Sequence, residues 1–169
     1  MPSWEDLLQQ NLKPSDDGTV RLRTCLMGIG SDLRGDDSVG LIVARALLQD
    51  KQIAQVSGLL ILEGGPAPEN YTGKIRAFQA EFVLLIDAAQ MDEAPGAIRW
   101  IPMEAIDGMS ASTHSLPLSM LASYLRHELN CEVGVLGIQP GQNEIGAELS
   151  LPVRAAANEI QMEIRELFL

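Results

Sequence analysis

The chain has 169 residues, of which 46% are hydrophobic, and it carries a formal net charge of −11. This length and this apolar content suffice for one domain with a hydrophobic core. The excess of acidic residues argues against nucleic-acid binding, which requires Lys and Arg against phosphate.

The same sequence predicts a cytoplasmic protein that does not enter a membrane. No window reaches the ~18 consecutive apolar residues of a membrane span. The N-terminal stretch MPSWEDLLQQ has neither the basic start nor the apolar run of a signal peptide. Cys25 and Cys131 lack a CxxC partner and are predicted to be buried thiols in a reducing compartment. A monomer is the expected oligomeric state.

Helical and strand-like patterns alternate along the chain. Residues 3–12 predict a short helix with Ser3 and Asp6 at its start, so that residues 1–20 form an N-terminal helical appendage and residues 21–169 a single α/β domain. In chain order the domain is predicted to contain a strand at 20–30, a helix at 37–49, a strand at 59–65, a helix at 66–79, strands at 82–89 and 97–102, a helix at 117–129, a strand at 132–140 and a helix at 152–168.

This alternation predicts an α/β fold with a mainly parallel twisted sheet of about five strands and helices on both faces. The short strand at 97–102 alternates in polarity, contains Pro102, and could lie antiparallel at an edge. Ligands bind beyond the carboxyl ends of the strands in such sheets. The residues directly after each strand are therefore the candidates for a functional site.

The first predicted strand ends in GIGSDLRGDDSVG, residues 28–40, which begins like a phosphate-binding loop. A dinucleotide fingerprint fails because Leu33 stands where the third glycine belongs, and a P-loop fails because Asp36 and Asp37 replace its Lys and Ser/Thr. Two carboxylates would repel a phosphate. One aspartate could cap the following helix, but only one of the pair can occupy the cap position.

Three ligating side chains converge on the predicted carboxyl edge. They are Asp37, Asp87 at the end of FVLLID, and His114 in the loop STHSLP. Two carboxylates and one imidazole suit a divalent first-row ion with open coordination positions. The alternatives are a turn or cap role for Asp87 and a structural role for His114.

A further group, Glu63, Gly64 and Gly65, follows the second predicted strand. Glycines there allow another chain to approach the backbone closely, so they are candidates for a substrate cleft.

Five ordered motifs, GIGSDLRGDDSVG, LEGGPAPEN, LLIDAAQ, STHSLPL and LGIQP, resemble those of the hydrogenase maturation endopeptidases, and most closely the branch that serves formate-hydrogenlyase-type hydrogenases. The resemblance runs from about residue 23 to residue 163. It implies an endopeptidase that removes the C-terminal extension from a nickel-loaded hydrogenase large-subunit precursor after a basic residue. It also implies that Asp37, Asp87 and His114 sense the nickel, which the substrate contributes and for which another divalent ion could substitute.

Two positions depart from the family pattern, since Ser31 replaces an asparagine and Glu63 replaces an aspartate. Asp37 or Glu63 is the expected general base, and Gly64 and Gly65 the expected floor of the substrate cleft. One alternative is a non-cutting checkpoint module that docks on the nickel-loaded large subunit. Another is a phosphate- or nucleotide-binding domain, which Asp36 and Asp37 oppose.

Overall fold

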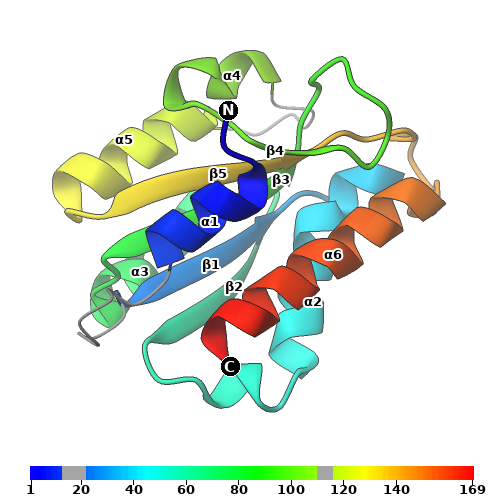
Figure 1. Cartoon of the computed structure of the whole chain (residues 1–169). Coiled ribbons are helices and arrows are strands. Elements are labelled where there is room, and N and C mark those ends of the chain that lie inside the picture. Colours follow the sequence, from blue (N-terminus) through cyan, green and yellow to red (C-terminus); the bar gives the residue numbers. More distant parts are fainter. Residues whose placement is uncertain (13–21, 110–115) are drawn as a thin grey trace.

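The computed structural model describes residues 1–12, 22–109 and 116–169, which are built around one five-stranded sheet (Figure 1). The strands are β1 (Thr24–Ile29), β2 (Leu59–Gly65), β3 (Phe82–Ala88), β4 (Ile98–Trp100) and β5 (Glu132–Ile138), in the order β2-β1-β3-β5-β4. All neighbours are parallel except β4, which pairs antiparallel with β5 at the edge. The predicted fold class, including the antiparallel edge strand, is confirmed.

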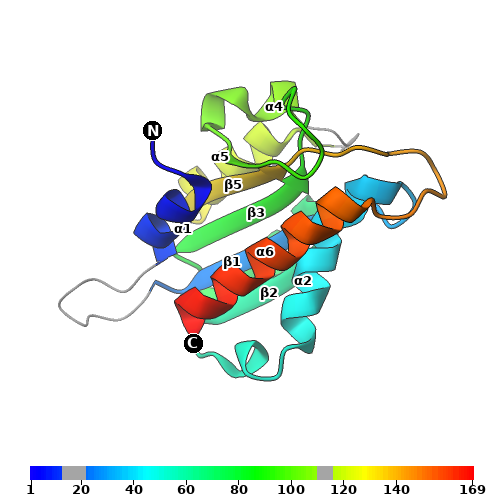
Figure 2. The same cartoon turned by 45° about the vertical axis from the view of Figure 1, so that its right-hand side comes forward.

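Helices cover both faces of the sheet (Figures 1 and 2). One face packs against α1 (Trp4–Leu12), α2 (Val39–Gln49) and α6 (Leu151–Phe168), and the other against α3 (Thr72–Phe78), α4 (Ile106–Met109) and α5 (Leu118–Glu128). Every residue of β1 and β3 is buried. Neighbouring side chains in a strand point to opposite faces, so these continuous apolar runs supply both cores at once.

The N-terminal helix α1 is part of the hydrophobic core. Ser3 and Asp6 form the predicted capping box, with N–H to side-chain oxygen distances of 2.9 and 3.1 Å. The apolar face of this helix packs inward: Trp4, Leu8 and Leu12 are buried in the same core cluster as α2 and α6, and Leu7 is half-buried. The tertiary contacts of this helix are with β4 and α6. Its assignment as an N-terminal appendage stays a prediction. The domain boundary at residue 20 stays a prediction, since residues 13–21 lie outside the described part.

Helix starts differ most from the prediction. The helix expected from Asp37 begins at Val39, after the 3₁₀ turn η1 (Gly35–Ser38), and the helix expected at 66–79 divides into η3 (Pro68–Tyr71) and α3. Tight 3₁₀ turns are common at helix N-termini, and sequence periodicity does not separate them from the helix that follows. The short elements η2 (Ile53–Gln55), η4 (Met103–Ala105) and α4 were not predicted. In the described part of the chain, no helix has both the length and the apolar character needed to cross a membrane.

Gly40 allows the start of α2 to lie against the ends of two strands. A Cβ atom on this residue would lie 2.2 Å from the carbonyl oxygen of Ile86 and 2.4 Å from that of Ile29. Since both neighbours are backbone atoms, Gly40→Ala should lower the free energy of unfolding by about 3 kcal/mol, measured by urea denaturation.

The matched control is Gly73→Ala in α3, where a Cβ atom meets nothing within 4 Å. That change should be neutral or stabilising by up to about 1 kcal/mol because alanine favours helix. Equal stabilities for the two variants would show that α2 is not held this close to the sheet.

Candidate active site

The two predicted acidic ligands both lie at the carboxyl edge of the sheet. Asp37 lies in η1 and Asp87 is the penultimate residue of β3, and their side chains are buried, with exposed fractions of 3% and 2%. The turn η1 packs directly against β3. Asp87 is a strand residue, not a turn or cap residue, and one of its carboxylate oxygens accepts the N–H of Ala88 at 2.9 Å.

Asp36 has a different role from Asp37. It is fully buried and accepts hydrogen bonds at 2.7–2.8 Å from the N–H groups of Gly141, Gln142 and Ser150 and from the Ser150 hydroxyl. Burial alone would raise the pKa of Asp36, but these hydrogen bonds outweigh burial and hold the pKa below its ordinary value. Asp36 therefore fastens the glycine turn to the loop that joins β5 to α6.

The suggestion that one of these aspartates caps the next helix is wrong. The N-cap positions of η1 and α2 are Arg34 and Ser38, and neither makes a side-chain cap bond. The carboxylate of Asp36 makes long-range hydrogen bonds to the loop after β5 and caps no helix.

The two loops at this edge are tied together along their length. Besides the Asp36 contacts, the N–H of Gly146 donates to the carbonyl of Leu33 at 2.8 Å. Gly35 has φ of +53°, and a Cβ atom there would lie 2.4 Å from the carbonyl oxygen of Gln142. In Figure 1 the loop after β1 and the loop after β5 accordingly run side by side. This bracing fixes the backbone that carries Asp37.

Gln139 supports the neighbouring loop, a role that the sequence analysis missed. Its buried side chain accepts the N–H of Met91 at 2.6 Å and donates to Gln90 at 2.9 Å, while its backbone carbonyl accepts the N–H of Gly96 at 2.8 Å. These contacts hold the segment that follows Asp87. The sequence signal for this supporting role is a polar glutamine directly after an apolar strand, in the motif GIQP.

Glu63, two residues before the end of β2, forms an ion pair. Its carboxylate accepts a hydrogen bond from the guanidinium of Arg45 on α2, and the same guanidinium binds Asp32 in the glycine turn. Its position is fixed further by the pairing of Glu63 with Gly28 in the β1–β2 ladder. A role for Glu63 in proton transfer stays a prediction.

The predicted cleft glycines differ from one another. A Cβ atom on Gly64 would lie 2.8 Å from the side chain of Met27, so the close approach expected there is made by the protein's own core. Gly65 has φ of +63° and open space around its Cβ position, and its carbonyl accepts the N–H of Gly30 at 3.1 Å. Only the Gly65 side of this pair has open space for a substrate chain.

The third predicted metal contact, His114, lies in residues 110–115, outside the described part of the chain. Within the described residues, no three His, Cys, Asp or Glu side chains gather closely enough to hold a metal ion. Asp37 and Asp87 supply hard oxygen donors, which suit a divalent cation. A bound cation would add to the hydrogen bonds in compensating the cost of burying these carboxylates.

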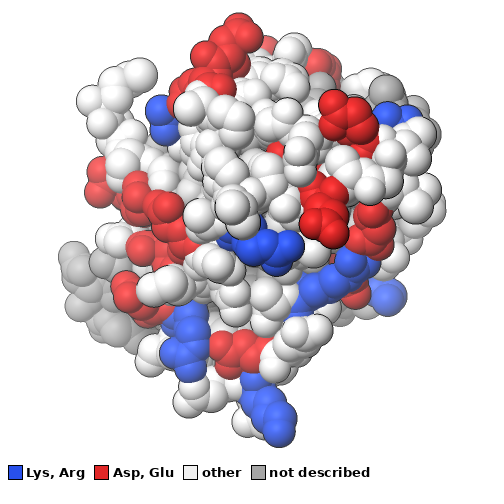
Figure 3. Space-filling view, turned by 90° about the vertical axis from the view of Figure 1, so that its right-hand side faces the viewer, with Lys and Arg blue, Asp and Glu red and all other residues white. Residues whose placement is uncertain are grey.

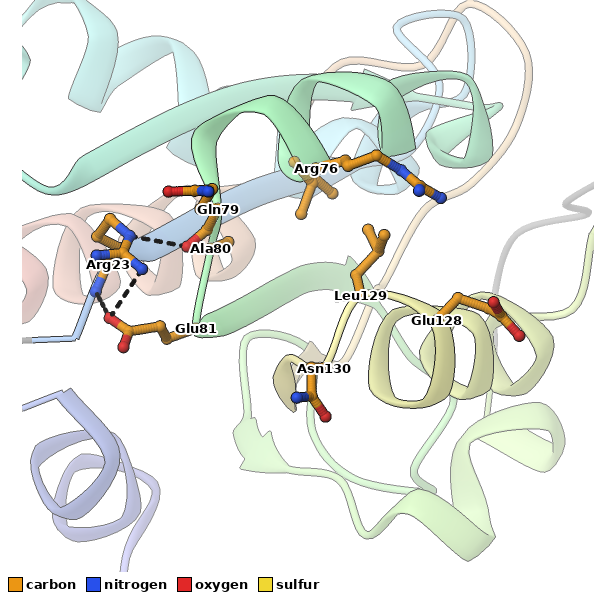
Figure 4. Close-up of a pocket in the computed structure, with 9 residues that line it drawn as sticks. Arg23, Arg76, Gln79, Ala80, Glu81, Glu128, Leu129 and Asn130 are labelled. Carbon is orange, nitrogen blue, oxygen red and sulfur yellow. Dashed lines mark hydrogen bonds and ion pairs between the residues drawn. The ribbon is translucent and has the colours of Figure 1, made fainter.

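Charges of both signs lie on the described surface at the carboxyl edge of the sheet. Figure 3 looks onto this side of the molecule and shows acidic and basic side chains interspersed with uncharged surface. A cavity of about 500 Å³, lined in part by Arg23, Arg76 and Glu81, lies at the opposite, amino edge of the sheet (Figure 4). That cavity is therefore separate from Asp37 and Asp87.

The chain is an α/β domain in which Asp36 and Asp37, both buried, stand where a P-loop would place its lysine and its Ser or Thr. The sequence model of the HycI hydrogenase maturation proteases matches residues 43–166. The chain belongs to the hydrogenase maturation protease family, and it is a peptidase. The family predicted from the five motifs is thereby confirmed.

Individual relatives agree with this assignment. The hydrogenase 3 maturation protease of Escherichia coli is 31% identical over 141 residues, covering 82% of this chain and 86% of that protein. A Methanocaldococcus jannaschii protein, also named for hydrogenase maturation protease activity, is 35% identical over 128 residues, covering 71% of this chain and 76% of that protein. The crystal structure of HycI from Thermococcus kodakarensis superposes with a TM-score of 0.77 at 34% identity, covering 87% of this chain and 92% of that chain.

Proposed function

We propose that this peptidase removes the C-terminal extension from the precursor of a nickel-iron hydrogenase large subunit after nickel has been inserted. The observation that carries the proposal is the burial of Asp37 and Asp87 at one edge of the sheet, on elements that pack together. The relatives named as hydrogenase maturation proteases support the substrate class. A cytoplasmic location and a monomeric state are part of the same proposal.

In this proposal Asp37, Asp87 and His114 contact the nickel that the substrate carries. Nickel bound in the substrate supplies Lewis acidity toward the scissile carbonyl or toward a water molecule. Another divalent ion that replaces nickel in the substrate could be sensed in the same way, because carboxylate donors are not selective for one metal.

The remaining steps belong to the protein's own side chains. The substrate chain lies beside Gly65, where the backbone is open, and water attacks the carbonyl carbon. A carboxylate accepts the proton from water and returns it to the leaving nitrogen as the C–N bond breaks. Asp37 is the first candidate for this base, and Glu63 is the second because its carboxylate already accepts a hydrogen bond from Arg45.

The test is the intact mass of a cognate precursor, with nickel or without it, after incubation with this protein. Loss of the C-terminal extension from the loaded precursor alone is the expected result. Equal cutting of both precursors would remove nickel sensing from the proposal. Binding to the loaded precursor without any mass change would instead establish the non-cutting checkpoint module.

A further inference from the structure

A single arginine bridges two acidic residues beside the proposed site. The Arg45 guanidinium donates through Nη1 and Nη2 to the two carboxylate oxygens of Asp32 at 2.6 and 2.7 Å, and through Nε to a carboxylate oxygen of Glu63. The contact with Asp32 is bidentate, a geometry that only the planar arginine fork can make. Three of its donors are therefore directed at two separate segments of the chain.

The two segments are the glycine turn after β1 and the last residues of β2, and the Gly30 N–H joins them by donating to the Gly65 carbonyl. Asp32 lies in the glycine turn that leads to Asp37, and Glu63 lies at the end of β2 directly before Gly64. Arg45 belongs to α2, the helix that η1 opens into. The Arg45 side chain thus extends from α2 to both Asp32 and Glu63.

The pairing of β1 with β2 is irregular next to Glu63. The β1–β2 ladder changes register between Gly28 and Ile29, beside Glu63. β2 is an edge strand, paired with β1 alone among the described strands. Past the irregularity, one bond from the Gly30 N–H to the Gly65 carbonyl continues the contact, at 3.1 Å. A bulge leaves local pairing weakened, so side chains have to fix the position of the strand end.

We propose that Arg45 is a positioning residue that clamps the end of β2 against the glycine turn and thereby orients the edge on which the substrate chain lies. This inference rests on the proposed function. It also gives Glu63 a specific role, as the partner through which the clamp acts on Gly64 and Gly65.

The ion pairs of Arg45 are expected to position the end of β2 and to add little to the free energy of unfolding. The side chains of Arg45, Asp32 and Glu63 are 38%, 53% and 40% exposed, and ion pairs this open to water contribute little to global stability. The hydrogen bond from Arg45 lowers the pKa of Asp32, and the two carboxylates raise the pKa of Arg45. The pair of Arg45 and Asp32 therefore stays charged throughout the neutral range in which a peptidase would be assayed.

The experiment compares Arg45→Met and Arg45→Lys with the wild-type protein on the nickel-loaded precursor. Arg45→Met should lower the cleavage rate constant by about 10- to 100-fold, because a displacement near 1 Å at a reacting centre has effects of that size. Arg45→Lys should recover part of the rate, since an ammonium retains the charge but not the fork. The melting temperature of each variant should stay within about 2 °C of wild type.

Amide hydrogen exchange supplies a readout that does not depend on cutting. The Gly30 amide should exchange faster in Arg45→Met, because its bond to Gly65 spans the two clamped segments. Arg126→Met on α5, an exposed arginine on another face, is the matched control and should change neither exchange nor cleavage.

A double-mutant cycle separates the clamp from independent effects. Glu63→Gln combined with Arg45→Met should slow cutting by less than the product of the two single-variant factors, since both changes disrupt the ion pair between Arg45 and Glu63. Two outcomes would overturn the proposal. One is that the losses in cleavage rate of the two single variants multiply fully in the double variant. The other is that Arg45→Met cleaves the precursor and exchanges the Gly30 amide at the wild-type rates. If wild type leaves the precursor uncut while Arg45→Met still speeds Gly30 exchange, the clamp stands as a structural device and the proposed function fails.

Discussion

Asp36→Ala is expected to lower the free energy of unfolding by about 3–5 kcal/mol, one of the two largest effects predicted for this protein. The reason is that the buried Asp36 carboxylate accepts four hydrogen bonds, three of them from backbone N–H groups. Removing the acceptor leaves those N–H groups without their partner, and it empties the volume of a side chain that is itself fully buried. The measurement is urea denaturation followed by circular dichroism.

Two variants calibrate this result. Ser150→Ala removes the hydroxyl bond alone and should cost about 1 kcal/mol. Glu144→Ala removes an exposed carboxylate from the loop that Asp36 holds and should stay within about 0.5 kcal/mol of wild type. A loss for Asp36→Ala no larger than that for Ser150→Ala would mean that the two loops are not held by this carboxylate.

Asp37→Asn and Asp87→Asn should each lower the rate of precursor cleavage by about 100-fold or more. Each change keeps the shape of the side chain but removes the negative charge that would contact the nickel of the substrate. Groups that stabilise charge in a transition state commonly contribute factors of this size. The measurement is single-turnover cleavage of the nickel-loaded precursor, followed by intact mass.

Asp92→Asn is the control for this pair. Asp92 is exposed in the segment that follows β3, and its φ of +55° is one that asparagine also tolerates. It should cut at the wild-type rate. Loss of activity in Asp37→Asn with full activity in Asp87→Asn would assign Asp37 to proton transfer and Asp87 to a structural role. Full activity in both would exclude the acidic pair from the reaction.

The sequence by itself determined the architecture, because the relevant patterns are local. Short apolar runs such as FVLLI, residues 82–86, fit a strand that is buried on both faces. The alternation of such runs with helical periodicity leaves few topologies. The carboxyl-edge rule then placed Asp37 and Asp87 on one side of the sheet, where the structure has them. The five motifs were sufficient to predict the family, since their order and spacing are specific in combination.

Tertiary structure alone decided how the acidic residues divide their roles. Asp36 and Asp37 are adjacent and chemically identical, yet the partners of Asp36 lie 105 to 114 residues further along the chain. The Arg45 bridge and the inclusion of α1 in the core depend in the same way on contacts between distant segments. Local sequence sets the helix or strand and the face on which a side chain lies. Which group meets that side chain is decided only when the elements pack, because a hydrogen bond or an ion pair requires two atoms within about 3 Å of each other.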